Sequence, residues 1–89
     1  MSNPSKSTLK SQINSEYRKK LKDLEAKIAK KHKELNEIER LLKHDTKRVD
    51  HSGIAELKSE KGRLNSAILN LKREIKKANK ERVKKLKKL

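Results

Sequence analysis

The sequence predicts an all-α protein, an antiparallel two-helix coiled-coil hairpin, from three observations. The 89 residues are 44% charged and only 30% hydrophobic, which is too little apolar material for a large globular core. One aromatic residue (Tyr17), one proline and two glycines leave little from which to build sheets and tight turns. The apolar residues recur at the alternating spacing of three and four that marks a coiled-coil seam. We therefore expect residues 1–89 to form a single domain of two long helices.

The first helix is expected at about residues 8 to 43. Its apolar residues hold the a and d positions of an unbroken heptad frame, in which Lys31 fills the one polar d position. Asn3 followed by Pro4 can start this helix, with Ser5 and Ser7 as competing caps. The predicted seam residues are Leu21, Leu24, Ile28, Leu35, Ile38 and Leu42.

The second helix is expected at about residues 54 to 87, with Lys61 at its one polar a position. Between the helices, at about residues 44 to 53, aspartate, threonine, serine and glycine cluster and the heptad frame is lost, which predicts a turn. Ser52 or Asp50 is expected to cap the second helix. The second seam consists of Ile54, Leu57, Leu64, Ile68, Leu71, Ile75 and Ala78.

A short turn between helices of similar length favours folding back. If Leu42 faces Leu57, each of the two seam lysines meets an isoleucine of the other helix and never the other lysine. A single continuous helix that dimerises end to end is the alternative, and the Ser52–Gly53 break argues against it. Near the open end of the hairpin, the apolar stripe is expected to leave the heptad frame through Leu9, Ile13 and Tyr17 on one helix and Val83 and Leu86 on the other.

A lone hairpin buries only one stripe of each helix, so its hydrophobic gain barely offsets the conformational entropy that folding costs. Pairing of two hairpins is the usual remedy. We therefore expect a homodimer in which two copies form a four-helix bundle. Leu41 and Leu69, which are apolar but lie off the inner seam, are candidates for a second contact surface.

The charge is unevenly distributed along the chain. Of a net charge of +15, residues 72–89 carry +8 and residues 1–20 carry +4, whereas residues 44–53 are neutral. In a hairpin both basic segments lie at the same end, so the molecule is expected to have one cationic end and one nearly neutral end. Such polarity favours a polyanion as partner.

Nucleic acid is the expected partner, because regularly spaced phosphates reward a row of cations through counterion release. Lysines outnumber arginines 21 to 6, and lysine lacks the planar fork that reads guanine, so contacts to DNA or RNA are expected mainly at phosphates. With Tyr17 as the only aromatic residue, base stacking is not expected. The expected nucleic-acid-binding residues are Arg18, Lys19, Lys20, Lys72, Arg73, Lys76, Lys77, Lys80, Arg82, Lys84, Lys85, Lys87 and Lys88.

A coiled-coil assembly or adaptor protein is the alternative function. In that case the apolar seam recognises a helical partner, and the lysines serve solubility or contact an acidic protein. An anionic membrane surface is a further possible contact for an edge made of Val83, Leu86 and Leu89, but the lack of Trp and Phe argues against it. No apolar run is long enough for a membrane span and no secretory signal is visible, so we expect a cytoplasmic protein.

No enzymatic chemistry is predicted. No nucleophile, base and orienting acid occur together, so we expect no catalytic residue and no cofactor. The lack of cysteine rules out disulfides and thiolate zinc sites. The turn holds His44, Asp45, Asp50 and His51, which could bind zinc if the loop closed on itself, but these are also ordinary turn residues and we predict no metal site.

Overall fold

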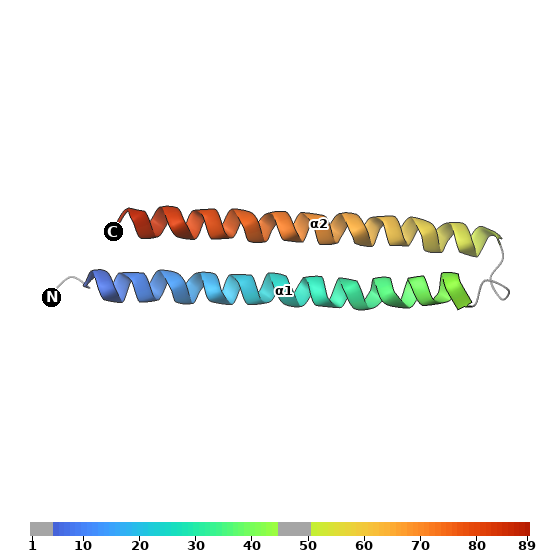
Figure 1. Ribbon diagram of the computed structural model, residues 1–89, viewed down its shortest axis with the longest axis horizontal. Helices are drawn as coiled ribbons and strands as arrows, with labels where there is room; N and C mark the ends of the chain where they lie inside the picture. Colours follow the sequence, from blue (N-terminus) through green and yellow to red (C-terminus); the bar gives the residue numbers. More distant parts are fainter. Residues whose placement is uncertain (1–4, 45–50) are drawn as a thin grey trace.

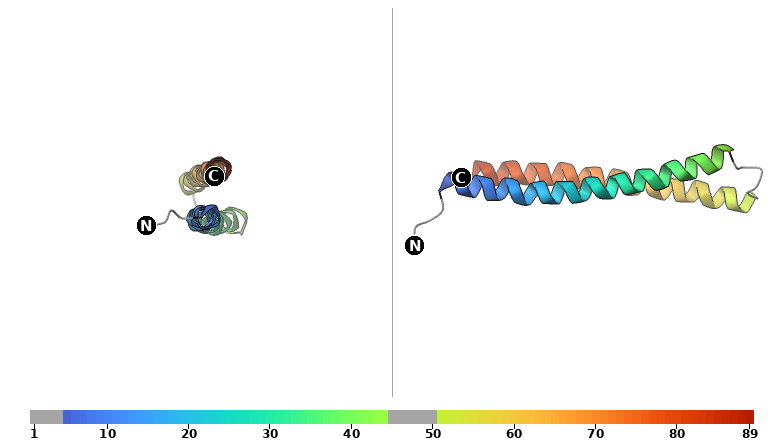
Figure 2. Two further views of the ribbon diagram at one scale, coloured as in Figure 1. Left: turned by 90° about the vertical axis from the view of Figure 1, so that its left-hand side faces the viewer. Right: turned by 90° about the horizontal axis from the view of Figure 1, so that it is seen from below.

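The computed structural model describes residues 5–44 and 51–89, which form two helices packed side by side along their whole length (Figures 1 and 2). Helix α1 spans Lys6–His44 and helix α2 spans His51–Lys87. The two run antiparallel, so the start of α1 and the end of α2 lie together at what we call the open end (Figure 1). The molecule is a rod of 70 × 17 × 15 Å. The predicted all-α hairpin is confirmed.

Helix α1 begins with a side-chain cap. The backbone amide of Thr8 donates a hydrogen bond to the Ser5 hydroxyl oxygen at 3.2 Å, and the two hydroxyl groups lie 3.0 Å apart. A hydroxyl at this position satisfies one of the amides that have no partner inside the first turn. Of the competing start signals, Ser5 is therefore the one that caps the helix. Asn3 and Pro4 lie outside the described residues.

Helix α2 begins earlier than the sequence predicts. Ser52 and Gly53 already belong to its first turn, so the prediction that Ser52 caps the helix is wrong. Polar residues are tolerated there because the first amides of a helix lie outside the ladder of intrahelical hydrogen bonds and can bond to other groups. Asp50, the other candidate cap, lies outside the described residues.

The two helices meet along the predicted seam. Near its centre Leu35 and Ile38 of α1 pack with Leu64 and Ile68 of α2, and Ile28, Leu42 and Leu57 pack against this group. The Lys61 ammonium reaches the Glu39 carboxylate across the seam at 3.6 Å, beside Ile38. This contact places the helices in the register that follows from Leu42 facing Leu57. Leu24 and Ala78 extend the buried seam toward the open end.

At the open end the predicted apolar stripe is observed in part: Leu9, Ile13 and Leu86 are half-buried and Tyr17 is buried, whereas Val83 is exposed. Tyr17 is seven residues before Leu24 and only 5% exposed, and Arg82 is seven residues after Ile75 and half-buried. Val83, which was expected in the apolar stripe, is 42% exposed because the frame gives the inward position to its neighbour. Polar residues therefore occupy seam positions at this end of the rod.

Candidate nucleic-acid interface

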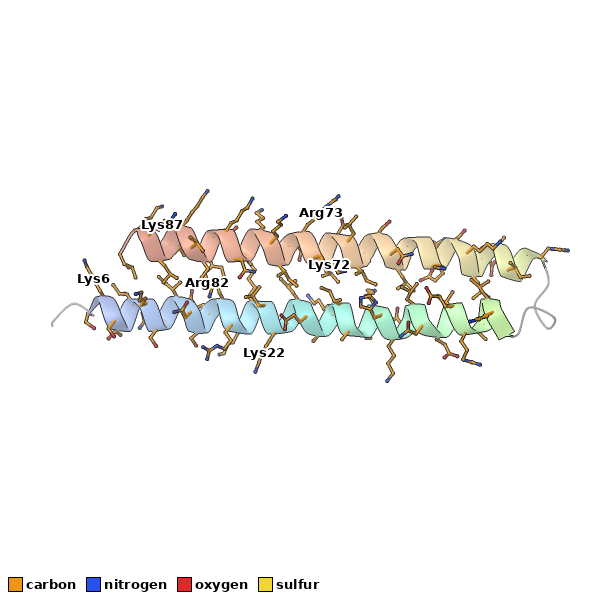
Figure 3. The ribbon with its side chains drawn as sticks, in the orientation of Figure 1. Lys6, Lys22, Lys72, Arg73, Arg82 and Lys87 are labelled. Carbon is orange, nitrogen blue, oxygen red and sulfur yellow. The ribbon has the colours of Figure 1, made fainter. Side chains whose placement is uncertain are left out.

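The outer side of α2 carries a continuous row of cations. These residues occupy the b, c and f positions of the heptad frame, which face away from the seam, and each is exposed. Arg73 and Lys87 point away from α1 (Figure 3). The row extends for about 21 Å along the helix axis, at 1.5 Å per residue. We call it the basic face, and it consists of Arg73, Lys76, Lys77, Lys80, Lys84 and Lys87.

No cation of the basic face is held in an ion pair within the described part of the chain, residues 5–44 and 51–89, although Glu74 and Glu81 lie in the same stretch of α2. None of its six side chains forms an ion pair or a hydrogen bond there. Toward the turn, in contrast, Arg63 pairs with Glu60 at 2.9 Å and Lys61 pairs with Glu39. The positive potential of the molecule is therefore strongest along the last third of α2, where an anion meets no internal competitor.

Lys85 differs from the other predicted binding residues because it is engaged within the chain. Its ammonium nitrogen lies 5.2 Å from the centre of the Tyr17 ring, a cation–π distance. A hydrogen bond to the Tyr17 side chain, helped by the charge of that group and by Glu16 and Glu81, raises the pKa of Lys85 above its ordinary value against a small opposing effect of burial. Lys72 and Lys88, the remaining predicted lysines of α2, are exposed at the borders of the seam.

Arg82 does not lie on the basic face. It projects between the two helices (Figure 3), and its Nε atom is buried without a hydrogen-bond partner among residues 5–44 and 51–89. A buried donor without a partner costs about 1 to 3 kcal/mol, and more when the group is charged. Arg82 is thus half-buried at a seam position, apart from the exposed cations of the basic face.

The three predicted residues of α1 are divided among different sides of the rod. Lys19 is at an f position, on the side of α1 that faces away from α2. The side chain of Lys22 also points away from α2 (Figure 3). Arg18 borders an open groove that Arg82 also lines, and Lys20 borders another with Lys85. The fold thus gathers the charge at one end of the rod but not on one face. A straight ligand that lies on the basic face does not reach Lys19.

Sequence reasoning placed Tyr17 in the apolar stripe but missed that Arg82 lies opposite it on the seam, although a signal for this exists. Both lie at multiples of seven from apolar seam residues, and the two positions face each other in the register that aligns Leu42 with Leu57. Asn14 and Lys85 are the next pair of facing positions, seven residues from Leu21 and Ala78. Extending the frame through polar residues identifies them, whereas following only the apolar residues does not.

The predicted turn cluster lies mostly outside the described residues, which include neither Asp45 nor Asp50. Within residues 5–44 and 51–89 no group of three or more histidine, aspartate or glutamate side chains is placed to hold a metal ion. Neither of the two described helices is long and apolar enough to cross a lipid bilayer. No family model, curated protein or solved structure matches the chain.

Proposed function

We propose that this hairpin binds nucleic acid through phosphate contacts made by the basic face of α2. The observation that carries the proposal is the row of six exposed cations that have no internal partner among the described residues. A row about 21 Å long runs beside about twelve phosphates of B-form DNA, counting both strands, so every cation has a phosphate within reach.

The shape of the rod favours contact with the backbone over insertion into a groove. The major groove of B-form DNA is about 12 Å wide, whereas the paired helices measure 17 × 15 Å in cross-section. Helix α2 is packed against α1 along its length, so only its outer side can approach the duplex. Lysines at the edges of that side then contact phosphates of the two strands that border the groove. Such contacts give affinity with little recognition of the bases.

The test compares two variants that lose the same charge. Lys76, Lys80 and Lys84 are replaced by glutamine on the basic face. In the control, Lys30, Lys33 and Lys43 are replaced by glutamine on the exposed outer side of α1. Glutamine and lysine have similar helix propensities, so both variants are expected to stay folded.

Affinity for duplex DNA, duplex RNA and heparin is measured by mobility shift over a range of salt concentrations. With about six phosphates engaged, log Kd is expected to change with log salt at a slope of about 5 in magnitude, and the basic-face variant is expected to lower that slope by about 3. The control variant should keep most of the slope. Equal losses in the two variants, or binding that ignores salt, would refute the proposal.

The same proposal includes a homodimer. Only seven hydrophobic residues are buried among the described residues, and Leu69 remains 49% exposed. Several seam residues of α2, among them Ile54 and Ile75, stay half-buried in the single hairpin, and a second copy that packs as a four-helix bundle covers more of that surface. Light scattering tests the dimer: the expected mass is twice 10.4 kDa, and a mass of 10.4 kDa would contradict it.

A coiled-coil adaptor is the second candidate function, and one feature near the turn favours it. Leu41, Gly53, Ala55 and Leu57 line a shallow open groove there, far from the cationic end. In this function the lysines in the last turn of α2 serve the helix itself, since cations stabilise the negative end of its dipole. The adaptor requires that polar substitution of Ile28 and Leu71 abolish partner binding while neutralising the basic face has little effect.

A further inference from the structure

The groove on one flank of the open end combines two guanidinium groups with little opposing charge. Arg18 and Arg82 line it from different helices, together with Asn14, Leu21, Lys22 and Glu25. Three cations thus surround one carboxylate. No ion pair joins Glu25 to either arginine within the described ranges 5–44 and 51–89, and the groove keeps an excess of positive charge.

Arg82 is the unusual member of this groove. It occupies a seam position at which the other turns of α2 place mostly apolar residues, and its buried Nε–H has no partner among the described residues. An apolar residue at the same place completes the seam, so the arginine weakens the hairpin as it stands. A ligand in the groove can still accept hydrogen bonds from the accessible nitrogens of the guanidinium, and binding there offsets part of the cost of placing this charge at the seam.

The opposite flank of the open end serves as an internal comparison. There Lys20 and Lys85 line a groove with Glu16 and Tyr17, and Tyr17 already engages Lys85. Lysine presents a point charge, whereas the planar fork of arginine matches two oxygens of a phosphate at once. The two flanks are therefore unequal, because only the first is lined by arginines, whose planar forks match a phosphate.

We propose that the groove between Arg18 and Arg82 is a binding site for a single phosphate group. The group is either a free phosphate ion or a backbone phosphate of the nucleic acid. The second source rests on the proposed function, and the first does not. On a nucleic acid, this site fixes the register of one phosphate beside the row held by the basic face.

The experiment follows the arginine Nε–H signals of the full chain in ¹H–¹⁵N spectra. Sodium phosphate is added in one series and sodium chloride, at matched ionic strength, in the other. Phosphate is expected to shift the Arg82 and Arg18 signals more than that of Arg73. Equal shifts in the two salts would overturn the site.

Two substitutions and a control separate ligand binding from stability. Arg82→Leu is expected to raise the Tm by about 4 °C or more, since it completes the seam, and to abolish the response of Arg18 to phosphate. Arg82→Lys keeps the charge but loses the fork, and is expected to weaken phosphate binding about tenfold. Arg73→Leu removes the same charge from the basic face and should leave the response intact. If Arg73→Leu and Arg82→Leu reduce the response equally, the effect is one of general charge and the site is refuted.

A second arm repeats the measurement with a short DNA duplex and distinguishes the two sources of phosphate. Arg82→Leu is expected to lower the salt slope of duplex binding by about 1. If it leaves that slope unchanged while still abolishing the phosphate response, the free ion is the ligand and the backbone source is refuted. If the wild-type chain binds phosphate but no nucleic acid, the proposed function fails and the site stands.

Discussion

The turn-side half of the rod and the half at the open end share one heptad frame but place different residues in it. Near the turn, the seam is built from Leu35, Ile38, Leu64 and Ile68, and the charges beside it are joined in pairs. Near the open end, Asn14, Arg82 and Lys85 occupy seam positions, and the row of cations on α2 has no internal partner in the described residues. The same helical geometry therefore serves cohesion in one half and display of charge in the other.

The largest expected effect is a loss of stability when a substitution creates a cavity in the turn-side seam. Leu64 is only 3% exposed, and Leu64→Ala is expected to lower the free energy of unfolding by about 2 to 5 kcal/mol, because it removes buried methyl groups and leaves a cavity. Urea unfolding followed by circular dichroism measures the change. Val83→Ala at the open end should change the free energy by less than about 0.5 kcal/mol, since Val83 is exposed. Similar losses in the two variants would contradict the difference in burial between these two positions.

Removal of the cap on α1 is expected to have a smaller effect, confined to the open end. Ser5→Ala deletes the hydroxyl that accepts the Thr8 amide, and should cost about 1 kcal/mol and fray the first turn. Hydrogen exchange at the amide of Thr8 is expected to accelerate, while the amides near Leu35 stay protected. Ser7→Ala, two residues after the cap, is the control. It should change the exchange rate neither at Thr8 nor near Leu35.

A glycine within α2 offers a stabilising change in the turn-side half. Gly62 lies inside the helix, and no heavy atom lies within 4 Å of the position that a Cβ would occupy. Gly62→Ala is expected to raise the free energy of unfolding by about 0.5 to 1 kcal/mol, because alanine restricts the unfolded chain and favours the helix. Ala26→Gly, at an exposed position of α1, should lower it by a similar amount. A destabilising Gly62→Ala would mean that this side of α2 is covered in solution.

The smallest expected effect is a shift in the titration of Lys85. Because Tyr17 raises the pKa of this ammonium group in the folded chain, its contribution to stability is complete below the ordinary value of 10.5 and is lost as the pH rises through the raised pKa. Tyr17→Phe removes the hydroxyl, and should lower the pKa of Lys85 toward the ordinary value. Carbon-13 chemical shifts of the lysine Cε atoms report the titration. An unchanged pKa in that variant would show that the ring alone holds the lysine.

The helices, their seam and their register could be predicted from the sequence because burial of apolar side chains is the main force available to a chain of this composition. In the register that aligns Leu42 with Leu57, Leu35 faces Leu64, and Lys31 and Lys61 each face an isoleucine. The start of α2 could not be predicted, since helix caps differ by about 1 kcal/mol and Ser52 suits both a cap and an exposed first turn.

The candidate site was predicted only in part, because the count of charges did not consider which side of its helix each residue occupies. Counting charge by segment located the cationic end but treated Arg18, Lys19 and Arg82 as members of one surface. Assigning heptad positions separates them, since position 19 faces outward from α1 and position 82 faces the seam. The inward direction of Arg82 does not follow from periodicity alone, because a long side chain at a seam position can also bend out to water.

Tyr17 gives the molecule a built-in optical reporter. The chain has no tryptophan and only this tyrosine, so all of its near-ultraviolet absorbance and emission comes from a ring that is buried at the cationic end and touched by Lys85. Any anion that draws Lys85 away, or that settles beside Arg82 in the facing position, alters the emission of that ring. The occupancy of the open end can thus be followed in the unlabelled protein, at the place where the charge is concentrated.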